Sequence, residues 1–169
     1  MKVNETERLA LRLLATDHAP FINQLLNDPA WLRFIGDRDV RTVEDADGYI
    51  LTGPVAMYER LGFGLCMTER KSVRVPMGIC GLIKRDGLAD IDIGFAFLPQ
   101  FRGCGYGYEA ALATTACGKN TLRLKRIVGI TSPDNLSSIT LLEKIGLKYE
   151  CMVRLPKSDD DTMLFEWRE

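Results

Sequence analysis

Residues 100–109 read Gln-Phe-Arg-Gly-Cys-Gly-Tyr-Gly-Tyr-Glu. Three glycines, at positions 103, 105 and 107, fall between an apolar run over 91–98 and a helix-like segment over 108–117. A glycine-rich turn at the start of a helix presents unpaired backbone N–H groups on the positive end of the helix dipole. Because glycine has no Cβ, it lets an anion approach the backbone and allows positive φ angles. The stretch therefore predicts a loop that binds phosphate groups.

Two familiar classes of glycine-rich loop are disfavoured by the neighbouring residues. A P-loop ends in Gly-Lys-Ser or Gly-Lys-Thr, and no such pair follows Gly107. A dinucleotide fingerprint has its third glycine where Tyr108 stands, and it needs an acid about 20 residues on, where Lys125 and Arg126 lie. What remains is Gln-x-x-Gly-x-Gly between a strand and a helix, which either binds a pyrophosphate or forms an ordinary tight turn.

Length and composition indicate one globular domain. The chain has 169 residues, enough for a single domain with its own core, and we expect one domain over 1–169. Hydrophobic residues make up 46% and charged residues 27%, as in soluble proteins. The formal net charge of −1 argues against nucleic acid or an anionic membrane as a partner. No apolar run reaches the roughly 18 residues that a membrane span needs.

Cysteine and histidine usage narrows the chemistry. The five cysteines, at positions 66, 80, 104, 117 and 151, are widely spaced and form no Cys-x-x-Cys pair. This pattern argues against a disulfide framework or a zinc site and favours a reducing cytoplasm, so we expect no metal. The single histidine, His18, lies near the start of a predicted helix, where a surface position is favoured. Histidine-dependent nucleophilic catalysis is therefore disfavoured.

The order of the expected elements predicts an α+β fold. Thr42 and Asp45 have the spacing of a capping box, Gly53-Pro54 interrupts the helix that follows, and Asp86-Gly87 is a hairpin turn signal. The sum is a mixed, mostly antiparallel sheet of about six or seven strands flanked by helices. Helices are expected over 16–27, 42–60, 106–118 and 136–145, and strands over 8–14, 63–68, 77–83, 89–98, 126–131, 147–154 and 163–167.

Three stretches resemble the GNAT N-acetyltransferase family, in particular its branch of ribosomal-protein N-terminal acetyltransferases. Thr6-Glu-Arg-Leu-Ala-Leu-Arg12 is similar to that branch's opening strand. The residues from Gln100 to Ala110 resemble its pyrophosphate loop, and those from Asn135 to Gly146 resemble its late helix. Because the three stretches occur in order across the chain, they are more specific together than any one alone. The resemblance implies the family's fold, with its sheet splayed at an acetyl-CoA site.

The resemblance also implies which residues hold acetyl-CoA. The strand end formed by Phe95, Ala96 and Phe97 would splay from the strand that begins at Arg126 and hold the pantetheine arm. Asn135 would contact the same arm, although a plain helix cap also explains it. The Arg102 guanidinium either meets a phosphate or is a solvated surface charge. The pyrophosphate would lie against the loop, chiefly its backbone N–H groups, formed by Gln100, Arg102, Gly103, Cys104, Gly105, Tyr106 and Gly107.

Acetyl transfer to an amine needs a base and donors for the carbonyl oxygen. Asp90 and Asp92 alternate with isoleucines and therefore share one face of their strand. Family members often carry a Glu near Asp92 that acts through a water, so the resemblance implies Asp92 as the base. The alternative is that both acids line a solvated face. The resemblance implies the backbone N–H near Phe97 as the donor to the carbonyl oxygen.

The general acid departs from the family pattern. Many relatives have a Tyr at the position of Leu142, and Leu cannot donate a proton. Ser138 lies on the same predicted helix four residues earlier, where that branch often has Ser. We therefore take Ser138 as the candidate donor to the departing thiolate and as a further cofactor contact.

The acceptor is the least determined part of the chemistry. In the family it is usually set by the first two helices and their connection, where Trp31, Phe34, Asp37 and Asp39 lie. The aromatics could wall a pocket and the acids could attract an amine, but core aromatics and a charged loop are the favoured explanation. The leading expectation is acetyl transfer to a peptide or protein N-terminal amine. A small-molecule amine acetyltransferase and a non-catalytic acyl-CoA-binding module are the alternatives, as monomer or homodimer.

Overall fold

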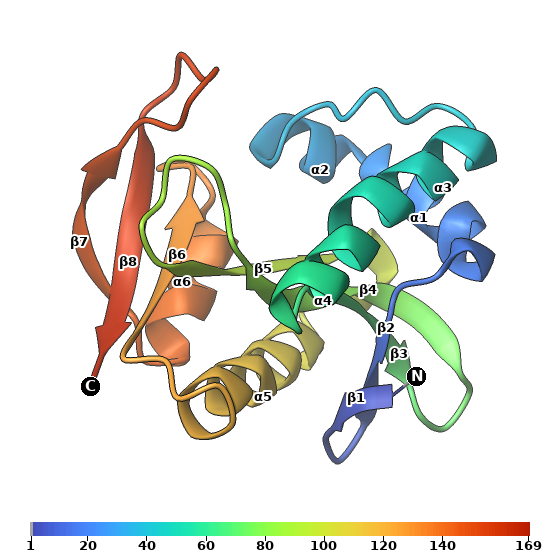
Figure 1. Cartoon of the computed structure of the whole chain (residues 1–169), viewed down its shortest axis with the longest axis horizontal. Helices are drawn as coiled ribbons and strands as arrows, with labels where there is room; N and C mark the ends of the chain where they lie inside the picture. Colours follow the sequence, from blue (N-terminus) through green and yellow to red (C-terminus); the bar gives the residue numbers. More distant parts are fainter. Residues whose placement is uncertain (1) are drawn as a thin grey trace.

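The computed structural model describes residues 2–169, which form one eight-stranded sheet with helices on both faces (Figure 1). The strand order is β1-β2-β3-β4-β5-β6-β8-β7, and all neighbours are antiparallel except β5 and β6. This confirms the α+β expectation, and the strand that was not expected is β1. The strands are β1 (Lys2–Glu5), β2 (Leu9–Leu13), β3 (Leu65–Arg70), β4 (Val75–Ile83), β5 (Ile91–Phe97), β6 (Arg126–Thr131), β7 (Lys148–Val153) and β8 (Thr162–Arg168).

The helices begin and end largely where the sequence predicts. Thr42 caps α3 through a capping box with Asp45, as expected. At Gly53-Pro54 the chain forms a π-helical turn, η2 (Leu51–Val55), because Pro54 cannot donate an intrahelical hydrogen bond. The α-helices are α1 (Ala19–Leu26), α2 (Pro29–Phe34), α3 (Val43–Ile50), α4 (Ala56–Leu61), α5 (Tyr106–Asn120) and α6 (Leu136–Lys144), with short 3₁₀ turns η1 (Thr16–His18) and η3 (Pro99–Phe101). None of the helices within residues 2–169 is long and apolar enough to cross a membrane.

The two faces of the sheet bury separate cores. Met67 and Ile79 pack with α1 and α3 residues in one cluster, whereas their neighbours Cys66 and Cys80 pack with α5 residues in another. Side chains alternate between the faces of a strand, so β3 and β4 contribute to both cores. Figure 1 shows α1 to α4 gathered on one side and α5 on the other. The central strands are therefore covered by helices on both faces.

The sheet splits between its two parallel strands. β5 and β6 pair only at Ile91–Ile127 and Asp92–Val128, although β5 continues to Phe97 and β6 to Thr131. On its other edge, β6 pairs with β8 along its whole length. The strands therefore diverge into a wedge that opens toward their carboxyl ends, as the resemblance implies.

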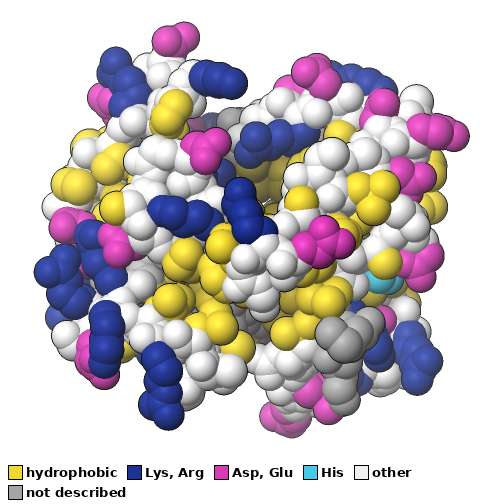
Figure 2. All heavy atoms as spheres, in the orientation of Figure 1, with side chains coloured by type: hydrophobic (Ala, Val, Ile, Leu, Met, Phe, Trp, Pro, Cys, Tyr) yellow, Lys and Arg dark blue, Asp and Glu magenta, His cyan; other side chains and the backbone are white. Residues whose placement is uncertain are grey.

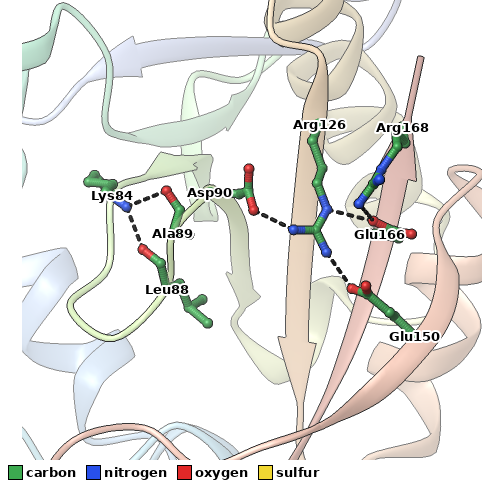
Figure 3. Close-up of polar contacts among 8 residues, drawn as sticks. All are labelled: Lys84, Leu88, Ala89, Asp90, Arg126, Glu150, Glu166 and Arg168. Atoms are coloured by element: carbon green, nitrogen blue, oxygen red, sulfur yellow. Dashed lines mark hydrogen bonds and ion pairs between the residues drawn. The ribbon is translucent and has the colours of Figure 1, made fainter.

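The closed end of the wedge is held by Arg126, the first residue of β6. Figure 3 shows its guanidinium in contact with carboxylates from the start of β5, from β7 and from β8. Nη1 is 2.5 Å from Asp90 Oδ2 and Nε is 2.5 Å from Glu166 Oε2, and the third partner is Glu150. This half-buried arginine thus links four segments of the sheet where the parallel pairing begins.

The loop that leads into β5 is longer than a tight hairpin. The expected turn lies at Asp86-Gly87, with Gly87 at φ +85°, but the connection between β4 and β5 runs over 84–90. The Lys84 ammonium donates to the carbonyl oxygens of Leu88 and Ala89 and so fixes this loop (Figure 3). The turn between β3 and β4 lies at 71–74, within the gap between the strands expected over 63–68 and 77–83.

Candidate active site

The glycine-rich loop joins η3 to α5 in a conformation that only glycine adopts easily. Gly103 and Gly105 have φ angles of +72° and +81°, and Gly105 is the N-cap residue of α5. Within residues 2–169, no acceptor is found for the backbone N–H groups from Gly103 to Tyr108, whereas the Arg102 N–H donates to Pro99 O. A run of free N–H groups at a helix N-terminus is suited to binding an anion.

A cavity of about 260 Å³ lies against this loop. It is lined by the three loop glycines and, from α6, by Ser137, Thr140, Leu141 and Lys144. Lys144 is a positive charge at this cavity that the sequence did not reveal, because it comes from a helix 40 residues later in the chain. Of the predicted loop residues, Gln100 and Cys104 do not line the cavity, and the Tyr106 ring is buried in the core.

The loop is tied to the start of the chain. Arg8 donates through Nε to Glu109 Oε2 (2.6 Å) and through Nη1 to Cys104 O (3.1 Å), and its guanidinium lies 4.5 Å from the Tyr106 ring centroid. Although burial opposes it, hydrogen bonds from Thr6 and Arg8 hold the pKa of Glu109 below its usual value. Two of the stretches that resemble the family, residues 6–12 and 100–110, thus contact each other directly. Their sequences alone do not reveal this contact.

A larger cavity of about 460 Å³ occupies the wedge and extends beneath α2, α3 and η2. Figure 2 shows this face hollowed between the two halves of the molecule, with Lys and Arg side chains beside the opening. The two cavities adjoin, since both are lined by Phe97, Arg102 and Ser137. The larger one brings together most of the predicted site residues: Asp92, Phe95, Ala96, Phe97, Arg102, Asn135 and Ser138.

The free edge of β5 faces the wedge. The Leu98 N–H donates to Met77 O at 2.9 Å, toward β4. Because N–H groups of successive strand residues point to opposite edges, the Phe97 N–H points away from β4 and toward the gap. β6 has already diverged at this point, so it supplies no partner. This orientation agrees with the expected donor to a carbonyl oxygen.

Arg102 has partners that the sequence did not predict. Its Nε donates to Phe97 O (2.9 Å) and its Nη2 to Asp28 Oδ2 (2.6 Å). Asp28 is only 7% exposed, and the same oxygen accepts the Ala30 N–H at the start of α2. Arg102 therefore links the glycine loop to the helices on the far side of the larger cavity. The phosphate contact expected for its guanidinium remains a prediction.

Asp92 is a buried carboxylate at the narrow end of the wedge. It is 0% exposed, so the alternative of a solvated face is wrong for this residue. Oδ2 accepts from Arg85 Nε at 2.9 Å, whereas Oδ1 is buried and has no partner among the described residues. Burial raises the pKa of Asp92 to about 6, against the opposing effects of the Arg85 charge and the Ile130 N–H. A carboxylate with such a pKa is well matched to proton abstraction near neutral pH.

The residues from α6 divide between the cavity and the core. Asn135 caps the helix, because its Oδ1 accepts the Ser138 N–H at 3.3 Å, and it also lines the larger cavity. Ser138 lines the cavity as well. Leu142 is 1% exposed and belongs to the core cluster instead. Position 142 thus serves packing in this chain, and the hydroxyl residues of α6 that line the larger cavity are Ser137 and Ser138.

One wall of the larger cavity is aromatic, which was the less favoured of the two explanations for Trp31 and Phe34, although Trp31 also belongs to a core cluster. Both residues line the cavity. Asp37 and Asp39 do not, and Asp37 instead forms an ion pair with Arg41, which lowers the pKa of Asp37 to about 2. The charged residues that do line the cavity are Asp28, Arg38, Arg85, Asp92 and Arg102. The arginines at 38 and 85 carried no local signal, because their neighbours in the chain lie outside the site.

The sequence and the fold both have recognisable relatives. A family described as the acetyltransferase (GNAT) domain matches residues 8–148. The curated protein YoaA of Bacillus subtilis, described as an uncharacterized N-acetyltransferase, is 26% identical over 152 residues, covering 89% of this chain and 85% of that protein.

Two solved structures superpose along nearly the whole chain. The acetyltransferase from Agrobacterium tumefaciens matches with a TM-score of 0.84 and 24% identity, covering 100% of this chain and 95% of the other. RimL, a ribosomal L7/L12 α-N-protein acetyltransferase solved in complex with coenzyme A, matches with a TM-score of 0.82 and 17% identity, covering 99% and 98%. At these identities the likeness is one of fold.

Proposed function

Because this chain belongs to the acetyltransferase (GNAT) family, and is thus an acetyl-CoA-dependent N-acetyltransferase, we propose that its acceptor is the N-terminal α-amine of a peptide or protein. The proposal takes residues 1–169 as one N-acetyltransferase domain. The observation that carries acetyl-CoA binding is the run of unpaired backbone N–H groups from Gly103 to Tyr108 beside the open wedge between β5 and β6, and the observation that carries the acceptor is the larger cavity, which opens at the surface.

The residues present fit acetyl-CoA. The free N–H groups from Gly103 to Tyr108 and the Lys144 ammonium at the smaller cavity suit a pyrophosphate. The free edge of β5 at Phe95 and Phe97 offers backbone groups to an amide-containing chain such as pantetheine. When bound, acetyl-CoA supplies the acetyl group as a thioester. The two adjoining cavities give a continuous path from the loop to Asp92 and Ser138.

Asp92 is the base in this proposal. Asp92 lines the larger cavity, and its buried Oδ1 accepts no hydrogen bond from the described residues, so this oxygen has a free lone pair for the amine proton or for a water that relays it. An α-amine has a pKa of about 8 and is partly neutral at pH 7, whereas a lysine side chain has a pKa of about 10.4. A base with a pKa of about 6 therefore suffices for an α-amine and is poorly matched to a lysine.

Ser138 is the donor to the departing thiolate, and the Phe97 N–H is the donor to the carbonyl oxygen. As the amine nitrogen forms its bond to the carbonyl carbon, the carbon–sulfur bond breaks and the sulfur takes up a proton. Ser138 lines the larger cavity together with its neighbour Ser137, and the Phe97 N–H faces the same space. Both groups belong to regular secondary structure, so they are held in place before the reaction begins.

Support for a peptide or protein acceptor comes from the shape of the site and from the relatives. The larger cavity is open at the surface beneath α2 and α3, so an extended chain end can enter while the rest stays outside (Figure 2). RimL, which has the same fold, is described as an α-N-protein acetyltransferase. The alternative acceptor is a small-molecule amine, for which a cavity of about 460 Å³ is also large enough.

The test is an acceptor screen with the purified full chain. Acetyl-CoA is supplied with short peptides with free N-termini, the same peptides with blocked N-termini but free lysines, and polyamines and amino acids. Thiol release is followed together with the mass of each acceptor. Modification of free N-termini alone supports the proposal. Modification of small amines alone replaces it with the alternative, and binding of acetyl-CoA without thiol release on any amine indicates an acyl-CoA-binding module.

A further inference from the structure

The charges around the larger cavity do not cancel. Three arginines and two aspartates line it, and each aspartate is already paired with an arginine: Asp28 with Arg102 and Asp92 with Arg85. Arg38 is left, and it forms no hydrogen bond or ion pair with any residue in the range 2–169. An arginine at a cavity wall without an anionic partner is a site for one.

Arg38 and Arg85 act on the same end of the cavity. Both charges act on the hydroxyl of Tyr49. Burial raises the pKa of this hydroxyl, and the positive charges of Arg38 and Arg85 both lower it. Arg85 donates to Asp92 only through Nε, which leaves its two terminal nitrogens available. The two arginines, one from the α2–α3 connection and one from the β4–β5 loop, therefore line the same cavity and both act on Tyr49.

Uncharged donors add to this end. The Trp31 Nε1 is buried and has no hydrogen-bond partner among the described residues, and the Tyr49 hydroxyl has none either. Both residues line the larger cavity. A buried donor without an acceptor, as at Trp31 Nε1, is rare in folded proteins because leaving it unpaired is unfavourable. A ligand that brings oxygen atoms to this wall would satisfy it.

We propose that the acceptor carries a carboxylate a few bonds from its reacting amine, and that Arg38 binds this carboxylate, with Arg85 and Tyr49 beside it. This inference rests on the proposed function and sharpens it: the preferred peptides have Asp or Glu as their first or second residue. The same chemistry would be supplied by the α-carboxylate of a free amino acid, and the experiment separates these two sources.

The proposal accounts for both ends of the acceptor. The amine lies toward Asp92, whose Oδ1 is an unpaired acceptor, and the carboxylate lies toward the unpaired donors. A basic peptide is disfavoured, because its cation would meet Arg38 with no free carboxylate nearby other than Asp92. The expected acids Asp37 and Asp39 do not line the cavity, so they do not reverse this preference.

The test compares amidated peptides that differ only at one position. Glu, Gln and Lys are placed at the first residue in one set and at the second in another, and kcat/KM is measured with saturating acetyl-CoA. Free glutamate and glutamine form a separate arm. We expect Glu peptides to exceed Gln peptides by about fivefold, since one ion pair at a partly exposed site is worth about 1 kcal/mol. Raising the salt concentration should reduce the ratio.

Arg38→Gln identifies the residue responsible. The variant should lose the preference for Glu over Gln while keeping its rate on the Gln peptide, and Arg38→Lys should keep part of the preference. Arg38 is exposed, so neither change endangers folding. The matched control is Arg60→Gln on α4, which removes the same charge from an exposed residue outside the cavity and should leave the preference unchanged.

The outcomes separate the inference from the proposed function. Acetylation of Glu and Gln peptides at equal rates overturns the carboxylate site and leaves the peptide acceptor standing, as does an equal loss on both peptides in Arg38→Gln. Preference for free glutamate over all peptides keeps the carboxylate site and overturns the peptide acceptor. Absence of acetylation on every amine overturns both.

Discussion

The two ends of the active site are built in different ways. At the glycine loop, the groups offered to the ligand are backbone N–H groups from one continuous segment, Gly103 to Tyr108. At the acceptor end, they are side chains from α2, α3 and the loops after α2 and β4. A backbone site depends on local conformation and tolerates variation of its side chains, whereas a side-chain site changes its specificity with each substitution. In the proposed function, the cofactor end therefore depends on local backbone geometry and the acceptor end on individual side chains.

The sharpest way to break the backbone end is Gly105→Asp. Its φ of +81° disfavours any side chain, the new Cβ would lie 3.3 Å from Arg8 Nη2, and a carboxylate would repel the pyrophosphate. We expect acetyl-CoA affinity to fall about 1,000-fold, equivalent to two charge-assisted hydrogen bonds of about 2 kcal/mol each. Isothermal titration calorimetry measures the change.

The matched control is Gly62→Asp. Gly62 ends α4 with a similar φ of +78° and open space around it, so the backbone strain is comparable but no ligand site is nearby. It should bind acetyl-CoA normally. Near-normal binding by Gly105→Asp would falsify the loop assignment.

Asp92→Asn tests the proposed base, which lies between the cofactor end and the acceptor end of the site. We expect kcat to fall about 100-fold, the lower range for loss of a general base, with acetyl-CoA affinity unchanged. The carboxylate is the active form, so the wild-type rate should rise as pH increases through about 6 and should rise again as the amine loses its proton near pH 8. The variant should lose the lower step in a pH–rate profile and keep the upper one.

Asp90→Asn is the control for that change. Asp90 is next but one in the chain, but it pairs with Arg126 and does not line the larger cavity. Its variant should keep both steps of the profile. If the step near pH 6 persists in Asp92→Asn, Asp92 is not the base.

Arg8→Gln removes side-chain contacts that hold the glycine loop in place, but it leaves the backbone N–H groups of the loop unchanged. The ion pair with Glu109 and the hydrogen bond to Cys104 O would be lost. Because Arg8 is partly exposed, the effect should be modest, about fivefold in acetyl-CoA affinity. Arg12→Gln, which breaks a similar pair with Glu69 away from the loop, should leave affinity unchanged. Equal effects in the two variants would show that the contacts of Arg8 with Glu109 and Cys104 do not contribute to acetyl-CoA binding.

Ser138→Ala should have the smallest effect. A serine hydroxyl is a weak proton donor, so we expect kcat to fall about threefold with acetyl-CoA affinity unaltered. The helix cap is retained, because Asn135 accepts from the Ser138 backbone N–H. Steady-state kinetics measures this. A fall in affinity with constant kcat would assign Ser138 to cofactor binding alone.

Much of the fold could be predicted because its signals are local. The capping box at Thr42, the strand over 126–131 and the helix after Asn135 each follow from residues within one or two turns of chain. β1 was missed because a four-residue edge strand carries little periodicity. The connection at Asp86-Gly87 was predicted to be shorter than it is. Lys84 fixes the longer loop by donating to two backbone carbonyls, and such contacts leave no motif in the sequence.

The sequence by itself indicated the glycine loop and the shared strand face of Asp90 and Asp92, because backbone geometry and strand alternation are set within about ten residues. The cofactor class and the candidate base followed from the resemblance to the GNAT family. Only the tertiary structure decided the acceptor end. Arg102 meets Asp28 across 74 residues and Arg8 meets Glu109 across 101. The charge left over at Arg38 emerges only after such pairs are known. Electrostatic balance in a cavity is a property of assembled side chains, so no local pattern contains it.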